Sequence, residues 1–154
     1  MNPLVDAVGA PVRRIIGWLE ALQPLAQAAA RLYVAQVFFR SGLLKLRDWE
    51  TTLALFNDEY HVPWLPPETA ALLGTGGEIA LPVLLALGLA GRFAAAGLSV
   101  VNVVAVLSLA EIAPAALQQH QFWGSLLVGL LLWGPGRWSL DALIVRRVTL
   151  SGGR

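Results

Sequence analysis

A single carboxylate lies inside a long apolar stretch of this sequence. Glu78 is the only ionisable residue in residues 69–90, TAALLGTGGEIALPVLLALGLA, which are otherwise apolar or small. A charge at the centre of a bilayer costs about 3 kcal/mol on insertion scales, so it needs a partner, a proton or water. Pro82 follows four residues later and has no N–H to donate to the carbonyl of residue 78. Another helix is therefore expected to bring polar groups to this point.

Arg40 is the partner that the sequence predicts for Glu78. At about 100° per residue, Arg40 shares one helical face with Tyr33 and Gln36, whereas Arg31 and Lys45 lie roughly opposite. A guanidinium binds a carboxylate through two parallel hydrogen bonds, which makes arginine a strong partner for a buried acid. Lys45, at the end of its helix, is expected to reach the headgroups instead. An Arg40–Glu78 pair that only sets the register of two helices is the plain alternative.

These residues predict a polar cleft that opens outward and holds a quinone headgroup or a small anion. A quinone oxygen accepts hydrogen bonds from arginine, and a carboxylate with a shifted pKa can take up a proton. The predicted ligand-binding residues are Arg31, Tyr33, Gln36, Arg40, Lys45 and Glu78. Three further residues near the outer surface form a predicted proton relay: His61, Glu111 and His120.

The elements that must position these residues are helices. The hydrophobic pattern and the prolines predict one domain over residues 1–154, an all-α integral membrane four-helix bundle. The predicted spans are residues 25–44, 69–90, 93–112 and 121–133. Amphipathic interfacial helices are predicted at residues 5–22, 49–60 and 139–147. The first of these is expected to end before Pro24. The loop after the first span is expected to fold over one end of the bundle.

Composition supports the membrane assignment and excludes several functions. Of the 154 residues, 56% are hydrophobic and only 14% are charged, against about 25% charged in soluble domains. The net charge of +1 and the lack of a dense Lys/Arg face exclude nucleic-acid binding. The absence of cysteine excludes disulfides, CxxC redox motifs and thiolate metal sites. No metal site and no intrinsic cofactor are predicted.

The distribution of basic residues predicts the orientation. Loops that carry more Lys and Arg face the cytoplasm. Lys45 and Arg47 are the basic residues on the side of the long loop. The other side carries seven: Arg13, Arg14, Arg92, Arg137, Arg146, Arg147 and Arg154. Both termini are therefore expected in the cytoplasm, with the long loop outside.

Three segments together resemble the DoxX family of small four-helix bacterial membrane proteins. They are RLYVAQVFFRSGLLKL, GGEIALPVLLALGLAGRFAA and GPGRWSLDAL, and the similarity extends over residues 31–143. The motif residues fall on Arg31, Gly42, Lys45, Gly77, Glu78, Arg92, Gly134, Gly136, Ser139 and Asp141.

The resemblance implies a membrane partner of a redox or detoxification system in the bacterial inner membrane. The family is named after a subunit of a thiosulfate:quinone oxidoreductase. The loop FNDEYHVPWLPP is similar to members found in gene clusters for metal-binding peptides, including copper-handling ones. We expect an accessory subunit that is not catalytic alone, has a quinone site, and contacts membrane lipids and a protein partner encoded nearby. A non-catalytic anchor for a periplasmic or metal-peptide handling protein, a small transporter, and a homo-oligomer stay open.

Overall fold

The computed structural model describes the backbone of residues 3–151 and the side chains of residues 11–149. The regular elements of these residues are all helices, which confirms the all-α class. An isolated bridge between Tyr60 and Leu109 is the one β-type pairing in this part of the chain. The helices are α1 Pro3–Arg47, α2 Trp49–Asp58, α3 Pro67–Leu87, α4 Gly91–Leu107, α5 Pro114–Trp133 and α6 Leu140–Ser151.

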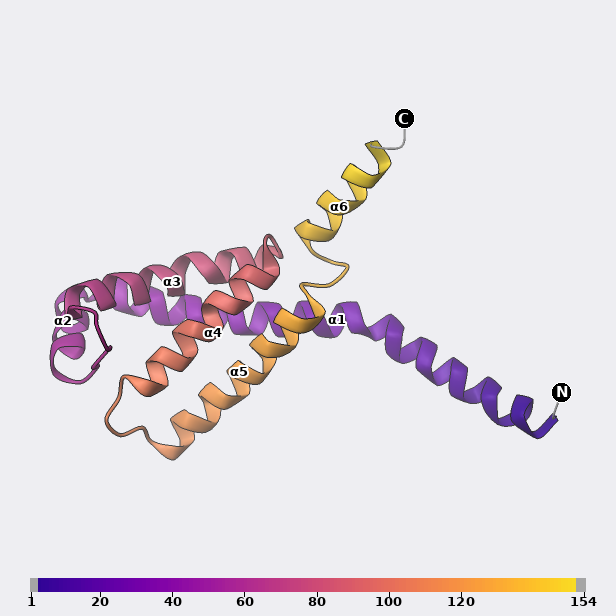
Figure 1. Cartoon of the computed structure of the whole chain (residues 1–154), viewed down its shortest axis with the longest axis horizontal. Coiled ribbons are helices and arrows are strands. Elements are labelled where there is room, and N and C mark those ends of the chain that lie inside the picture. The colour runs from indigo at the N-terminus through magenta and orange to yellow at the C-terminus, as the bar shows by residue number, and fades with distance from the viewer. Residues whose placement is uncertain (1–2, 152–154) are drawn as a thin grey trace.

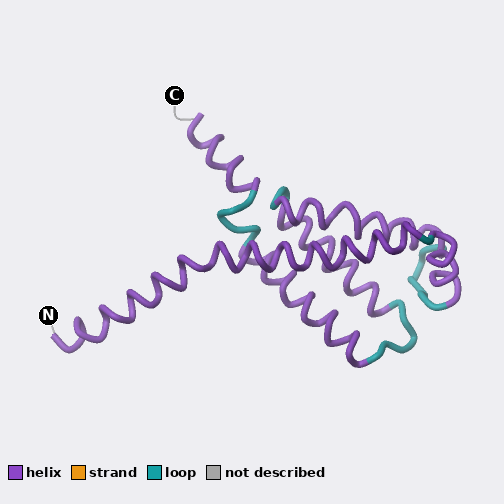
Figure 2. The backbone as a smooth tube through the Cα atoms, turned by 180° about the vertical axis from the view of Figure 1, so that it is seen from behind, coloured by secondary structure: helices purple, strands orange, loops and turns teal. Residues whose placement is uncertain are grey.

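Four of the helices form a bundle. The C-terminal half of α1 runs antiparallel to α3, and α4 packs against both α3 and α5 (Figures 1 and 2). Their shared core contains Val34 and Phe38 from α1, Leu85 from α3, Leu98 from α4 and Leu127 from α5. α2 covers one end of the bundle, while α6 and the N-terminal half of α1 project from the other end (Figure 1).

One helix has both the length and the apolar composition of a membrane span. Among the described residues this is α3, with 21 residues, whereas α4 is apolar but has 17. A bundle in which four helices cross the membrane therefore stays a prediction.

The structure differs from the prediction at Pro24, because α1 continues through both Pro11 and Pro24 as one helix of 45 residues. A proline inside a helix removes one hydrogen bond and bends the axis, and the flanking turns can continue. The helix changes direction where it leaves the bundle (Figure 1). At 1.5 Å per residue it is about 68 Å long, roughly twice the hydrocarbon thickness of a bilayer.

The remaining boundaries follow local chemistry. α2 begins after Asp48, whose carboxylate accepts a hydrogen bond from the Thr51 backbone N–H at 3.0 Å. Hydrogen bonds from Thr51 hold the pKa of Asp48 below its usual value. α5 begins at Pro114, seven residues before the predicted 121, because proline fits the first turn of a helix. α4 ends at Leu107 rather than at 112.

The long loop caps the α2 end of the bundle, as expected. The backbone N–H of His61 donates to the carbonyl of Ser108 at 2.8 Å, which ties this loop to the α4–α5 connection. Phe56 of α2 packs against Ala70 and Ala71 of α3. The cap therefore has its own small apolar core.

Candidate functional site

Glu78 forms an ion pair with Lys45. The Lys45 Nζ lies 2.6 Å from Glu78 Oε2 and also donates to Ser41 Oγ at 2.9 Å. The two side chains are 22% and 9% exposed. Gly42 permits this approach, because a Cβ at that position would lie only 3.0 Å from the Glu78 Cβ. The absence of a side chain at Gly42 thus lets α1 and α3 come close enough to pair.

The predicted Arg40–Glu78 pair is wrong. Arg40 is exposed, and its two terminal nitrogens lie 3.2 and 2.9 Å from the side-chain oxygen of Gln36 once that amide is turned toward them. The face of α1 that packs inward contains Arg31, Val34, Phe38, Gly42 and Lys45. The helical geometry separated the two faces correctly, but the prediction assigned the wrong face to the interior.

A cavity of about 330 Å³ lies above the ion pair, between α1, α3 and α4 and beneath α2 and its loop. Most of its wall is apolar, including Phe56, Leu73 and Val104. Its polar lining residues are Ser41, Lys45, Tyr60, Glu78, Ser108 and His120. This volume falls at the lower end of the range for small-molecule sites, about 300–1,000 Å³.

The ion pair gives the cavity hydrogen-bonding capacity without net charge. An ammonium has three donor hydrogens, and Lys45 uses two of them on Ser41 and Glu78. Among the described residues, only the Oε2 oxygen of Glu78 receives a hydrogen bond. Burial raises the pKa of Tyr60, as do the nearby charges of Glu59 and Glu78, so its hydroxyl remains a donor at neutral pH. The site therefore suits a neutral polar group better than an anion.

His120 reaches the cavity in one defined tautomer. The Asn102 Nδ2 donates to the His120 backbone carbonyl at 3.0 Å, and that carbonyl can only accept. Asn102 Oδ1 therefore faces His120 Nδ1, 2.8 Å away, and the neutral ring carries its hydrogen on Nδ1. Its Nε2 is then a hydrogen-bond acceptor. The same bonds join α4 to α5.

The other two members of the predicted relay do not line this cavity. His61 is exposed, and its Nδ1 lies 3.2 Å from the Glu59 carbonyl. It borders a separate shallow hollow on the outer side of the loop. Glu111 is exposed in the α4–α5 connection. Of the three, the structure brings only His120 to the ion pair.

Arg31, predicted as a ligand-binding residue, lies at the opposite end of the bundle. It is 4% exposed, and its Nη1 and Nη2 donate to the carbonyls of Pro135 and Trp138 at 2.9 and 2.7 Å. Arg31 thus fastens the α5–α6 connection to α1. Its contacts are those of a structural residue.

Asp141 completes this attachment. Its carboxylate accepts from the backbone N–H groups of Ala90 and Gly91, both at 2.8 Å, and so caps the start of α4. Its own backbone N–H donates to the carbonyl of Gly88 at 3.0 Å. We call Arg31, Gly88, Ser139 and Asp141 the latch, since they join the α3–α4 turn, the α5–α6 connection and α1.

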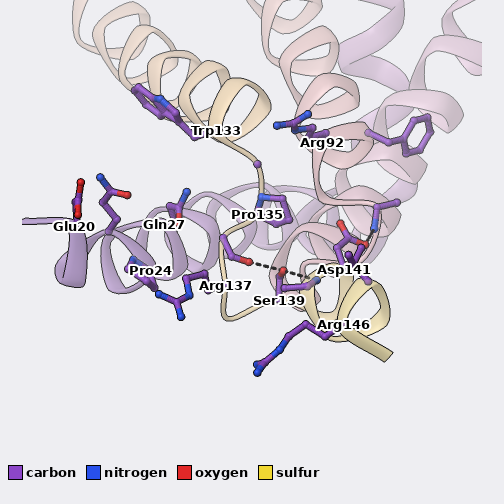
Figure 3. Close-up of a pocket in the computed structure, with 17 residues that line it drawn as sticks. Glu20, Pro24, Gln27, Arg92, Trp133, Pro135, Arg137, Ser139, Asp141 and Arg146 are labelled. Atoms are coloured by element: carbon purple, nitrogen blue, oxygen red, sulfur yellow. Dashed lines mark hydrogen bonds between the residues drawn. The ribbon is translucent and has the colours of Figure 1, made fainter. Parts of the chain in front are cut away.

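An open hollow of about 1,050 Å³ lies beside the latch (Figure 3). Arg92, Arg137 and Arg146 border it, and all three are exposed. Arg92 Nη2 donates to the Leu132 carbonyl at 3.2 Å. Figure 3 shows Arg146 directed away from the rest of the lining. Arg92, Ser139 and Asp141 at its wall already bond to backbone groups.

The motif residues therefore divide into two clusters. Lys45 and Glu78 line the cavity, and Gly42 and Gly77 neighbour them where α1 and α4 pack against α3. At or beside the latch lie the other six, Arg31, Arg92, Gly134, Gly136, Ser139 and Asp141. Sequence reasoning missed Tyr60 and Ser41 as cavity residues. Ser41 had a signal, because it precedes Lys45 by four residues and so lies on the same helical face.

Comparisons with known proteins identify relatives of this chain. The family model of DoxX matches residues 26–111, which include the whole cavity wall of α1, α3 and α4. An uncharacterized membrane protein of Mycobacterium tuberculosis, Rv3486, is 39% identical over 152 residues, covering 88% of this chain and 91% of the relative. No solved structure matches the chain significantly.

Proposed function

Because the chain belongs to the DoxX family of membrane proteins, we propose that it is a membrane subunit of a redox or detoxification system whose cavity binds a neutral quinone headgroup. The observation that carries this proposal is the Lys45–Glu78 pair at the floor of an apolar cavity. The proposal shifts the predicted quinone site from Arg40 to Lys45.

The proposed placement in the membrane follows from the bundle. The C-terminal half of α1, together with α3, α4 and α5, crosses the bacterial inner membrane, and both termini face the cytoplasm. The basic residues Arg92, Arg137 and Arg146 lie at the latch end, as a cytoplasmic end requires. α2 and its loop then cover the periplasmic end, and the cavity lies beneath them.

The polar groups of the cavity match the two redox states of a quinone. A quinone carbonyl accepts hydrogen bonds, and Lys45 has a hydrogen left to donate, as has the Tyr60 hydroxyl. A quinol hydroxyl donates, and the Nε2 of His120 accepts. The apolar wall accommodates the ring, while the carboxylate of Glu78 repels an anion and so argues against the small-anion alternative.

In this proposal, the electrons that reduce the quinone come from another protein. The sequence has no cysteine, so a thiol or a thiolate-bound centre would belong to a partner subunit. The chain's own residues bind the quinone and orient it, and His120 holds its proton at Nδ1, on the side of Asn102. This is the accessory role expected from the family resemblance.

Binding measurements test the proposal. Short-tailed benzoquinone and naphthoquinone analogues are titrated into the purified protein in neutral micelles. Lys45→Met should weaken binding about tenfold or more, because a hydrogen bond from a charged donor is worth about 1.5–3 kcal/mol. The control is Arg47→Met, which removes an exposed charge two residues away. Equal affinity in the wild type and both variants would refute the quinone site.

A further inference from the structure

We infer that the α1 face bearing Tyr33, Gln36 and Arg40 docks a transmembrane helix of another protein that carries an aspartate or glutamate at the level of Arg40. This inference rests on the membrane placement of the proposed function and is independent of quinone binding. It arises because the carboxylate expected to neutralise Arg40 is paired with Lys45 instead.

The packing of α1 on α3 sets the depth of Arg40. Glu78 lies one residue past the midpoint of α3, the helix with the composition of a span. Gly42 is level with Glu78, because a Cβ on Gly42 would lie 3.0 Å from the Glu78 Cβ. Arg40 precedes Gly42 by two residues, or about 3 Å along the axis. Arg40 therefore lies close to the middle of the membrane.

The charge of Arg40 is not neutralised within the described part of the chain. Its side chain is exposed, and its partner there is the uncharged amide of Gln36, four residues earlier. Side chains in a helix lean toward its N-terminus, and the bond to Gln36 holds the guanidinium in that direction. The guanidinium therefore points away from the nearer, outer end of α1 and does not reach the outer headgroups.

Charge complementarity selects the occupant of this face. An unpaired arginine at this depth is costly, and such residues meet an acid or water in functional assemblies. The headgroup region begins about 15 Å from the bilayer midplane, beyond the reach of a side chain that points inward. A second copy offers no free carboxylate at this level either. The acids of α3, α4 and α5 are Glu68, in the first turn of α3 and ten residues from Glu78, and Glu78 itself, which Lys45 already binds. The partner that remains for Arg40 is an acidic residue on a helix of a different protein.

The surroundings of Arg40 suit a helix. Tyr33 is 45% exposed and meets Phe122 of α5 edge-on, with ring centroids 6.0 Å apart. Phe122 is itself 53% exposed. The face thus combines one charge and one amide with aromatic rings from two helices, and such a surface can pack against an apolar helix that carries a single acid.

The test uses two designed leucine-rich transmembrane peptides that differ only in a central Glu or Gln. The full-length protein and each peptide carry a fluorescent donor and acceptor, and energy transfer is measured in uncharged phosphatidylcholine vesicles. The wild type should bind the Glu peptide about tenfold more tightly than the Gln peptide. Arg40→Gln should abolish this preference, and the control Arg47→Gln should retain it.

Several results would overturn the inference. The first is equal binding of the Glu and Gln peptides, and the second is a preference for the Glu peptide that persists in Arg40→Gln. The third is energy transfer between two copies of the chain that depends on Arg40. The fourth is loss of the preference for the Glu peptide when phosphatidylglycerol is added to the vesicles. Reaction of Gln36→Cys with a membrane-impermeant maleimide would also overturn it, because the face would then lie in water. Quinone affinity, measured on Arg40→Gln in micelles, is expected to be unchanged. Failure of the quinone site would thus be seen separately from failure of the docking face.

Discussion

At the scale of single residues, the Lys45–Glu78 pair explains how a carboxylate is tolerated in the middle of α3. Each charge loses its hydrogen bonds to water on burial. The ion pair replaces them in part for both residues, and Lys45 gains a further hydrogen bond to Ser41. Both residues line the cavity, and the Lys45 side chain is 22% exposed. A pair used only to hold two helices together has no need of that exposure.

The first prediction concerns the energetic coupling of the pair. Lys45→Met should lower the free energy of unfolding by about 3 kcal/mol, because it leaves a buried carboxylate without a partner. Glu78→Gln should cost less, since the more exposed lysine can turn toward water. The double variant should lie close to the wild type. Denaturant titration in mixed micelles measures all four proteins, and additive losses in the double variant would show that the two charges do not interact.

The sequence identified Glu78 but not its partner. The spacing placed Arg31 and Lys45 on one face of the first helix and Tyr33, Gln36 and Arg40 on the other, as the structure shows. Both faces carry polar residues, so periodicity alone does not decide which one is buried. The signal that decides it is Gly42, three residues before Lys45, because a glycine marks the face where another helix comes close.

At the scale of elements, the latch joins segments that are far apart in the sequence. Gly88 has φ 65°, and a Cβ there would meet the Ser139 side chain at 2.5 Å as well as the Arg31 guanidinium. The α3–α4 turn can therefore be made only by a residue without a side chain. This explains why glycine, arginine and aspartate occur together in the motifs.

The second prediction compares Gly88, the C-cap of α3, with Gly76 in the middle of the same helix. Gly88→Ala should lower the free energy of unfolding by more than about 1 kcal/mol, because of its positive φ and the contacts of the added methyl. Gly76→Ala is the control, since a Cβ there meets nothing within 4 Å and alanine favours a helix by about 1 kcal/mol. Thermal unfolding of both variants in the same detergent checks this. Equal stabilities would mean that the latch does not constrain the turn.

The helices themselves could largely be predicted, whereas their continuity could not. Apolar runs bounded by Pro63, Pro67 and Pro114 indicate where helices begin and end. Pro24 has the same appearance in the sequence, yet α1 passes through it. Whether a proline ends a helix or only bends it depends on the packing of the turns on each side, and that is not visible in local sequence.

At the scale of the whole molecule, the two ends of the bundle differ in character. One end carries the latch with its exposed arginines, and the other carries the cap of α2 and its loop over the cavity (Figure 1). The sequence predicted the cap from the amphipathic pattern and prolines of residues 49–67. It predicted an outward-opening polar cleft at Glu78, but not the mostly apolar wall beneath the cap, because that wall depends on how separate segments pack.

The third prediction is the orientation. The chain has no cysteine, so single cysteines can be introduced without background. Asp58→Cys, at the end of α2, should react with an impermeant maleimide added to intact cells. Arg137→Cys, in the α5–α6 connection, should react only after the inner membrane is opened, because seven basic residues mark that side as cytoplasmic. The reverse pattern would invert the proposed topology.

The central claim is that a ligand occupies the cavity above the ion pair, and a filling variant tests it most directly. Ala105→Trp places an indole in the cavity and leaves Lys45 and Glu78 intact, whereas Val103→Trp places one on the 52% exposed outer face of the same helix. Isothermal titration of a short-tailed naphthoquinone into each protein gives the affinity. We predict that Ala105→Trp loses quinone binding while Val103→Trp binds like the wild type. Wild-type affinity in Ala105→Trp would contradict the account.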